Sequence, residues 1–97
     1  MEFDWDPAKN AKNLEKHGVA FEEAITAFDD PFALIAPDLK HSTVEEERDW
    51  LLGESDMGVL VVIFTIRKPG PIFWIISARP ASRRERRQYA DNRRIPI

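Results

Sequence analysis

The sequence of 97 residues contains no cysteine, two histidines and four glycines. Without cysteine, the chain cannot form disulfides, cysteine-ligated zinc sites or a thiol nucleophile. With only His17 and His41, we do not expect a histidine-rich metal centre. No apolar run approaches the ~20 residues that a membrane-spanning helix needs, and the acidic start MEFDWD does not fit a signal peptide. We therefore expect a cytoplasmic protein with no metal, no cofactor and no membrane association.

The chain also lacks repeats, low-complexity tracts and a Gly/Ser-rich linker. Its length fits one domain, since domains typically contain ~100–150 residues. A content of 43% hydrophobic and 32% charged residues is ordinary for a folded protein and too apolar for a disordered one. We therefore expect a single domain over residues 1–97.

The net charge of −3 hides an asymmetry between the two ends of the chain. Residues 1–66 carry 5 basic and 15 acidic side chains, whereas residues 67–97 carry 9 basic and 2 acidic ones. The basic side chains of the second part are arginines except for Lys68. Guanidinium groups match the geometry of phosphate, so this end suggests a polyanion partner. The alternative is a solvated surface, or pairing with the acidic part.

Two helices are expected at the N-terminal end. Asp6 followed by Pro7 is a favourable helix start, and Gly18 is a left-handed helix end. A second helix over residues 21–28 follows from apolar side chains at helical spacing, and Asp29-Asp30-Pro31 ends it. The expected inner face of the first helix consists of Ala8, Ala11 and Leu14, with the stem of Glu15 as an optional member. Its expected outer face consists of Lys9, Lys12, Asn13 and Lys16.

Four strands follow, at residues 32–36, 48–53, 59–67 and 72–78, with a polar loop between the first two. Short turns between consecutive strands favour an antiparallel sheet. A turn at residues 68–71 would pair Arg67 with Ile72, Val62 with Ser77 and Leu60 with Arg79. Arg67 and Arg79 would then lie roughly 23 Å apart along the hairpin, at ~3.3 Å per residue. The central strands are apolar on both faces, which suggests helices on one face and a partner on the other.

The last element is a helix over residues 83–92. Ser82 and Glu85 form the capping-box pattern S-x-x-E, and Tyr89 and Ala90 are the only non-polar residues that follow in the helix. A helix this polar is either solvated or a contact surface. The expected fold class is α+β, with two N-terminal helices, a four-stranded antiparallel sheet and a C-terminal helix.

Several of these segments together resemble the BrnT family. The N-terminal ones are FDWDP at residues 3–7, Lys9, Asn13, KHGV at 16–19 and FEEA at 21–24. The C-terminal ones are IISAR at 75–79, RRERR at 83–87 and Tyr89. Glu47-Arg48 and residues 60–62 and 65–67 also fit. The resemblance covers residues 2 to about 90, and it departs from the family at Ala20, Trp74 and Pro80.

This resemblance implies a RelE-like fold and a ribonuclease toxin of a type II toxin-antitoxin system that stops translation. It implies a BrnA-like antitoxin with a ribbon-helix-helix DNA-binding domain. The complex would repress its own operon, so operator DNA would be contacted only through the antitoxin. A homodimer within the toxin-antitoxin complex is left open.

Metal-free RNA cleavage needs a base, an acid and cations for the charge that develops on phosphorus. Arg79 is the main candidate cation, because it ends a central strand beside a helix start; the alternative is pairing with an acidic neighbour. Arg83, Arg86 and Tyr89 lie along one helix flank and are further catalytic candidates. Tyr89 would stack on a base, donate a proton or, as the alternative, anchor the helix.

His17 is the candidate for proton transfer, with helix capping as its alternative role. His41 lies in a polar loop without a visible partner, and no role is assigned to it. Four further cationic side chains are assigned to RNA binding: Arg67, Arg84, Arg87 and Lys9.

The first alternative to an enzyme is a non-catalytic module that binds nucleic acid or a partner and acts in operon autorepression. A second alternative is a structural partner held in a hetero-oligomer by apolar sheet surface such as Phe73 and Trp74.

Overall fold

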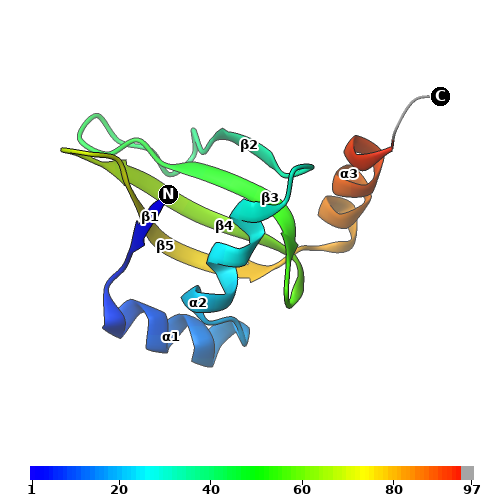
Figure 1. Ribbon diagram of the computed structural model, residues 1–97, viewed down its shortest axis with the longest axis horizontal. Coiled ribbons are helices and arrows are strands. Elements are labelled where there is room, and N and C mark those ends of the chain that lie inside the picture. The colour runs from blue at the N-terminus through cyan, green and yellow to red at the C-terminus, as the bar shows by residue number, and fades with distance from the viewer. Residues whose placement is uncertain (95–97) are drawn as a thin grey trace.

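The computed structural model describes residues 1–94 and contains three α-helices and a five-stranded sheet (Figure 1). The expectation of an α+β fold is confirmed. The elements in chain order are β1 (Glu2–Asp4), α1 (Pro7–His17), α2 (Phe21–Ala24), the 3₁₀ helix η1 (Ile25–Asp29), β2 (Leu34–Pro37), β3 (Asp49–Ser55), β4 (Gly58–Arg67), β5 (Ile72–Pro80) and α3 (Arg83–Arg93).

The sheet has five strands in the order β1-β5-β4-β3-β2, so the prediction of four strands was wrong. Strands β2 to β5 form the expected antiparallel meander. The additional strand β1 pairs in parallel with β5, with Phe3 opposite Phe73, and the sheet is therefore mixed. Only three residues pair there, and their alternation of polar and apolar side chains is too short to predict a strand.

Helix α1 begins and ends where the sequence predicts. The Asp6 carboxylate accepts a hydrogen bond from the Ala8 N–H, and Gly18 adopts a left-handed conformation with φ of 71°. The predicted inner face was wrong, however. Leu14 is half exposed, and Asn13 is the buried residue of the helix.

Asn13 is buried because its amide satisfies backbone groups of two other segments. Its Nδ2 donates to the carbonyl oxygens of Val19 and Ala78, each at 2.8 Å, and its Oδ1 accepts from the Ala78 N–H at 3.1 Å. A polar side chain on an apparently solvated face thus ties α1 to β5 near the C-terminal end of that strand.

The predicted second helix is only partly regular. The α-helical part covers Phe21–Ala24, and the chain then tightens into the 3₁₀ helix Ile25–Asp29. The apolar positions still face the core, since Phe21, Ala24 and Ala27 are fully buried.

The predicted register of the last hairpin holds only near its turn. Arg67 pairs with Ile72 and Phe64 with Ile75, as expected, and then an irregularity occurs between Ile63 and Phe64. Beyond it the pairing shifts by one residue, so that Arg79 lies opposite Val61 rather than Leu60. Val62 likewise pairs with Ala78 instead of Ser77. Such a bulge leaves one residue of a strand unpaired and bends it.

The two faces of the sheet are covered unequally. One face packs against α1, α2 and η1 through the main hydrophobic core, which includes Phe21, Leu51, Val62, Phe64 and Ile75. The other face carries a smaller cluster of Leu52, Val61, Ala81 and Tyr89, and there α3 packs near one end of the sheet (Figure 1). We call this second side the open face.

Helix α3 is attached to the fold by polar contacts and one buried aromatic ring. Both hydrogen bonds of the predicted capping box are present, from Glu85 N–H to the Ser82 hydroxyl and from Ser82 N–H to the Glu85 carboxylate. The Tyr89 hydroxyl donates to the Asp30 carboxylate, and Asn92 Nδ2 donates to the Phe32 carbonyl oxygen. Within residues 1–94, every helix is too short or too polar to cross a lipid bilayer.

Candidate active site

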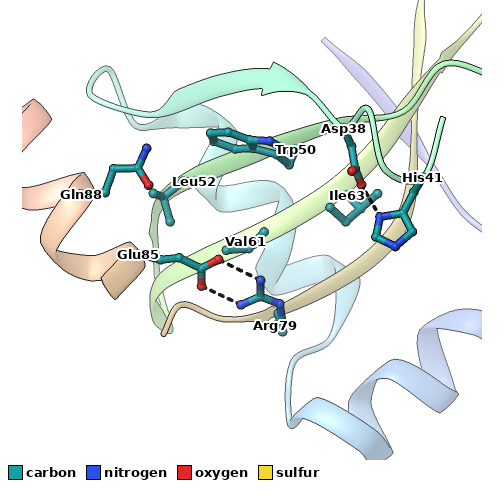
Figure 2. A pocket seen from close by; sticks show the side chains of 9 residues that line it. All are labelled: Asp38, His41, Trp50, Leu52, Val61, Ile63, Arg79, Glu85 and Gln88. Carbon is teal, nitrogen blue, oxygen red and sulfur yellow. Dashed lines mark hydrogen bonds and ion pairs between the residues drawn. The ribbon is translucent and has the colours of Figure 1, made fainter. Parts of the chain in front are cut away.

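A pocket of about 200 Å³ lies on the open face, between the sheet and the start of α3 (Figure 2). Its apolar lining comes from β3 and β4 and consists of Trp50, Leu52, Val61 and Ile63. The polar lining residues are Asp38, His41, Arg79, Glu85 and Gln88. Sites that enclose a small molecule typically measure ~300–1,000 Å³. This smaller, open pocket fits one group of a larger ligand.

Arg79 and Glu85 form an ion pair with two hydrogen bonds at one side of the pocket (Figure 2). Arg79 Nη1 lies 2.7 Å from Glu85 Oε1, and Arg79 Nη2 lies 2.9 Å from Glu85 Oε2. The hydrogen bond from Arg79 is the main cause that lowers the pKa of Glu85 to about 2. The same hydrogen bond raises the pKa of Arg79 above its usual value. Both groups are therefore charged at neutral pH.

The pairing leaves part of the Arg79 guanidinium available. Its Nη1 also donates to the Pro80 carbonyl oxygen at 3.4 Å, whereas Nε has no hydrogen-bond partner within residues 1–94. A guanidinium has five N–H groups, so Nε and the second hydrogen of Nη2 form a further planar edge. Such an edge fits two oxygens of a phosphate.

Local sequence explains how this pair is assembled. β5 carries Arg79 at its end, and Pro80 and Ala81 lead directly to the N-cap Ser82. The capping box orients the Glu85 side chain back toward Ser82, and this orientation also faces Arg79. Pairing with an acidic neighbour, which the sequence left open as the alternative role of Arg79, is thus present in the structure.

A histidine and an aspartate line the pocket away from α3. His41 Nδ1 lies 2.8 Å from Asp38 Oδ2 (Figure 2). This partner of His41, three residues earlier, is not evident in a polar loop, so the sequence predicts no role for the histidine. The spacing Asp-x-x-His directly after an apolar strand was the signal that could have found the pair. Trp50 and Gln88 were also missed as lining residues.

The other expected site residues lie outside the pocket lining. Arg83, Arg84, Arg86 and Arg87 are exposed on α3. Tyr89 on the same helix is buried against the open face, and burial is the main cause that raises its pKa to about 12. Its hydroxyl bond to Asp30 anchors the helix, which was the alternative role considered for it.

His17 and the pair of Lys9 and Arg67 lie elsewhere. His17 ends α1, which packs on the opposite side of the sheet from the pocket, so the structure does not bring it together with Arg79. Lys9 and Arg67 line a separate groove with Trp74, and the guanidinium carbon of Arg67 lies 3.8 Å from the centroid of the Trp74 ring. Arg67 and Arg79 are at opposite ends of the hairpin, as predicted.

The chain was compared with models of known protein families. A family model described as a ribonuclease toxin, BrnT, of type II toxin-antitoxin systems matches residues 5–85. The chain belongs to the BrnT family. The matched range includes every residue that lines the pocket except Gln88. No curated protein is similar enough to the chain to count as a match.

Membership of this family identifies the chain as a toxin of ribonuclease type from a toxin-antitoxin system, and it implies an antitoxin partner. Among residues 1–94, no three side chains of histidine, aspartate or glutamate gather in a way that could hold a metal ion.

Proposed function

We propose that this protein is a metal-independent endoribonuclease that cleaves RNA at the open-face pocket and thereby inhibits translation. The observation that carries this proposal is the geometry of Arg79. Glu85 fixes one edge of its guanidinium through two hydrogen bonds, and the other edge has no protein partner within the described chain. A fixed cation beside an apolar pocket can stabilise charge that develops on a phosphate during reaction.

The reaction that suits these residues uses the substrate's own 2′-hydroxyl as the nucleophile. The oxygen attacks the neighbouring phosphorus, and Arg79 stabilises the negative charge of the five-coordinate transition state. Trp50 lies half-buried on the pocket floor, where a base that flanks the scissile phosphate can stack on its ring. Such stacking contributes ~1–3 kcal/mol per base in single-strand binding.

RNA would be held mainly by cations outside the pocket. The exposed arginines of α3 are Arg83, Arg84, Arg86 and Arg87, and their side chains can follow the phosphate backbone. Within the pocket Glu85 neutralises the charge of Arg79, so attraction of RNA has to come from these neighbours. The groove of Lys9, Arg67 and Trp74 is a second contact for a longer strand, because its three basic side chains, with Arg48, outnumber the two acidic ones, Asp6 and Glu46.

Replacement of Arg79 by alanine tests the proposal directly. We expect RNA cleavage in excess EDTA to fall by ~10²–10³, by analogy with the loss of one donor to a developing oxyanion. Lys12→Ala is the matched control, because Lys12 is an exposed cation on α1 and its removal changes the net charge equally. Cleavage by Arg79→Ala at the control's rate would contradict a role for this residue.

The same assay separates an enzyme from a binding module. Retarded but intact RNA with the unmodified protein would favour the alternative, a non-catalytic module that acts in operon autorepression. Cleavage that disappears with EDTA and returns with a divalent cation would contradict metal independence.

The partner that we propose is a BrnA-like ribbon-helix-helix antitoxin. The open face presents apolar side chains that α3 covers only near one end, and α3 adds a row of arginines. An antitoxin segment with apolar and acidic side chains would bury both and exclude RNA from the same surface. Operator DNA would then be contacted only through the antitoxin, and a homodimer of the toxin could form within the complex.

A further inference from the structure

We infer that His41 is the general base of RNA cleavage in this pocket and that Asp38 is its positioning residue. The inference rests on the proposed function, since it assigns the proton transfer of that reaction. It starts from the observation that a histidine from the loop after β2 lines the same pocket as Arg79 on β5 (Figure 2).

The hydrogen bond to Asp38 determines which nitrogen of His41 is free. A carboxylate can only accept a hydrogen bond, so a neutral imidazole that pairs with it carries its proton on Nδ1, which lies 2.8 Å from Asp38 Oδ2. Nε2 is then left as an acceptor. The Asp38 side chain is 10% exposed and the His41 side chain 58% exposed, so the aspartate is the buried support and the imidazole is the accessible group.

The carboxylate is not needed to hold the turn in which it lies. The Asp38 backbone carbonyl accepts from the N–H groups of His41 and Ser42, at 3.2 and 3.0 Å, and from the Ser42 hydroxyl at 2.8 Å. The Asp38 N–H donates to the Arg48 carbonyl oxygen at 2.8 Å. Within residues 1–94, His41 is the only hydrogen-bond partner of the carboxylate. The side chain of Asp38 therefore orients His41 in a turn that backbone bonds already define.

The other ionisable groups that line the pocket do not fit the role of a base. Arg79 is a cation at neutral pH, and both oxygens of Glu85 are engaged by Arg79, with one also accepting from Ser82. Those hydrogen bonds lower the pKa of Glu85 to about 2, which makes it a weak base. Histidine is the side chain that exchanges protons most readily near neutral pH.

The proposed step balances as follows. Nε2 of His41 takes the proton of the 2′-hydroxyl while that oxygen bonds to phosphorus, and the bond between phosphorus and the 5′-oxygen breaks. The departing 5′-oxygen takes a proton from water, and the hydroxide formed takes the proton back from His41. The products are a 2′,3′-cyclic phosphate and a 5′-hydroxyl end, with no change of oxidation state.

The test compares single-turnover cleavage of a labelled RNA oligonucleotide by the full chain and by His41→Gln. Cleavage should fall by ~10²–10⁴, as for loss of a general base. The Kd for a 2′-deoxy-substituted oligonucleotide, which binds but lacks the nucleophile, should stay within about twofold. The rate of the unmodified protein should rise with pH through the neutral range, and this rise should be absent in His41→Gln. Leu39→Ala is the control for the loop, because Leu39 is 84% exposed and is not in the pocket lining.

Two further variants exclude a purely structural role. Added imidazole should restore part of the activity of His41→Ala, an effect that a structural histidine would not give. Asp38→Asn should slow cleavage at least ~10-fold, because an amide can donate to Nδ1 and favour the wrong tautomer. Melting temperatures of all variants would show whether each one folds.

The outcomes separate the inference from the function on which it rests. If the unmodified protein cleaves no RNA, the proposed function fails and the inference fails with it. If it cleaves RNA and His41→Gln cleaves equally fast, only the inference fails. Loss of cleavage in His17→Gln with full activity in His41→Gln would assign the base to His17, and a product with a 3′-hydroxyl end would also overturn the step.

Discussion

Replacement of Glu85 by glutamine should lower the stability of the protein and raise its affinity for RNA at the same time. The Glu85 carboxylate accepts hydrogen bonds from Ser82 N–H at 2.8 Å and from both terminal nitrogens of Arg79. Glutamine keeps one carbonyl oxygen for the capping box, since S-x-x-Q also serves. It removes the negative charge and one of the two acceptors that fix Arg79.

The pKa of Glu85 gives the size of the loss in stability. A shift from 4.5 to about 2 corresponds to roughly 3 kcal/mol, at 1.36 kcal/mol per unit. The Arg79 side chain is 45% exposed, so solvent screening reduces the expected contribution to about 1–2 kcal/mol. Because the folded-state pKa lies below the unfolded one, this stabilisation is complete above about pH 4.5. It is lost as the pH falls toward about 2.

The gain in affinity follows from the charge that glutamine removes. Two unit charges about 7 Å apart interact with roughly 0.6 kcal/mol in water, which is about threefold in Kd. Cleavage should nevertheless slow, because Arg79 would no longer be held in one plane. The variant should thus bind a 2′-deoxy RNA more tightly and cleave RNA more slowly.

Urea unfolding at pH 7 and at pH 2.5, with RNA binding and single-turnover cleavage at fixed salt, would measure all three effects. Glu54→Gln is the matched control. Glu54 on β3 pairs with Arg93 of helix α3 at 3.3 Å, and both side chains are about half exposed. We expect the free energy of unfolding to fall by less than ~1 kcal/mol when that surface pair is lost. An unchanged free energy of unfolding at pH 7 in Glu85→Gln, or weaker RNA binding, would refute the reasoning.

Two other predictions concern the fold and the antitoxin. Asn13→Ala should destabilise the protein by ~2–4 kcal/mol, because it leaves the buried N–H and carbonyl of Ala78 without their partners, and thermal unfolding should show a fall of roughly 10–25 °C. A loss below ~1 kcal/mol would mean that water replaces the amide. Antitoxin binding should slow hydrogen exchange at residues 83–90 and in strand 72–80, since new contacts suppress local opening. Unchanged exchange in both segments would mean that the antitoxin binds elsewhere.

Local signals in the sequence were sufficient to predict where α1 begins and ends and where α3 begins. Asp6-Pro7 and Gly18 bound α1, and Ser82 with Glu85 starts α3, because each cap depends on residues within a few positions. Strand β1 was missed since the strand that it pairs with, β5, lies about 70 residues away in the sequence. The bulge near Phe64 was equally invisible, because apolar residues on both strands allow either register.

The same distinction between local and distant partners applies to the pocket. The position of Arg79 beside a helix start could be predicted, since β5 and the capping box are adjacent in the chain. The contribution of Trp50 could not be predicted, because the sequence of a strand does not show whether its tryptophan packs in the core or lines a pocket. Asn13 was misplaced for a related reason, as its partner Ala78 lies 65 residues further along.

The charge asymmetry of the chain takes on a different meaning once the pocket is assembled. Its two sides come from the two parts of the sequence: Asp38 and His41 from the acidic part, and Arg79 and Glu85 from the basic part. Within the pocket Asp38 pairs with His41 and Glu85 pairs with Arg79, so the pocket alone attracts anions only weakly. Under the proposed function, the exposed arginines of α3 therefore attract RNA over long range. The paired groups of the pocket orient the scissile phosphate and transfer the proton. Under the proposed function, loss of an α3 arginine should act mainly on RNA affinity and its salt dependence, and loss of a pocket group mainly on the rate of cleavage.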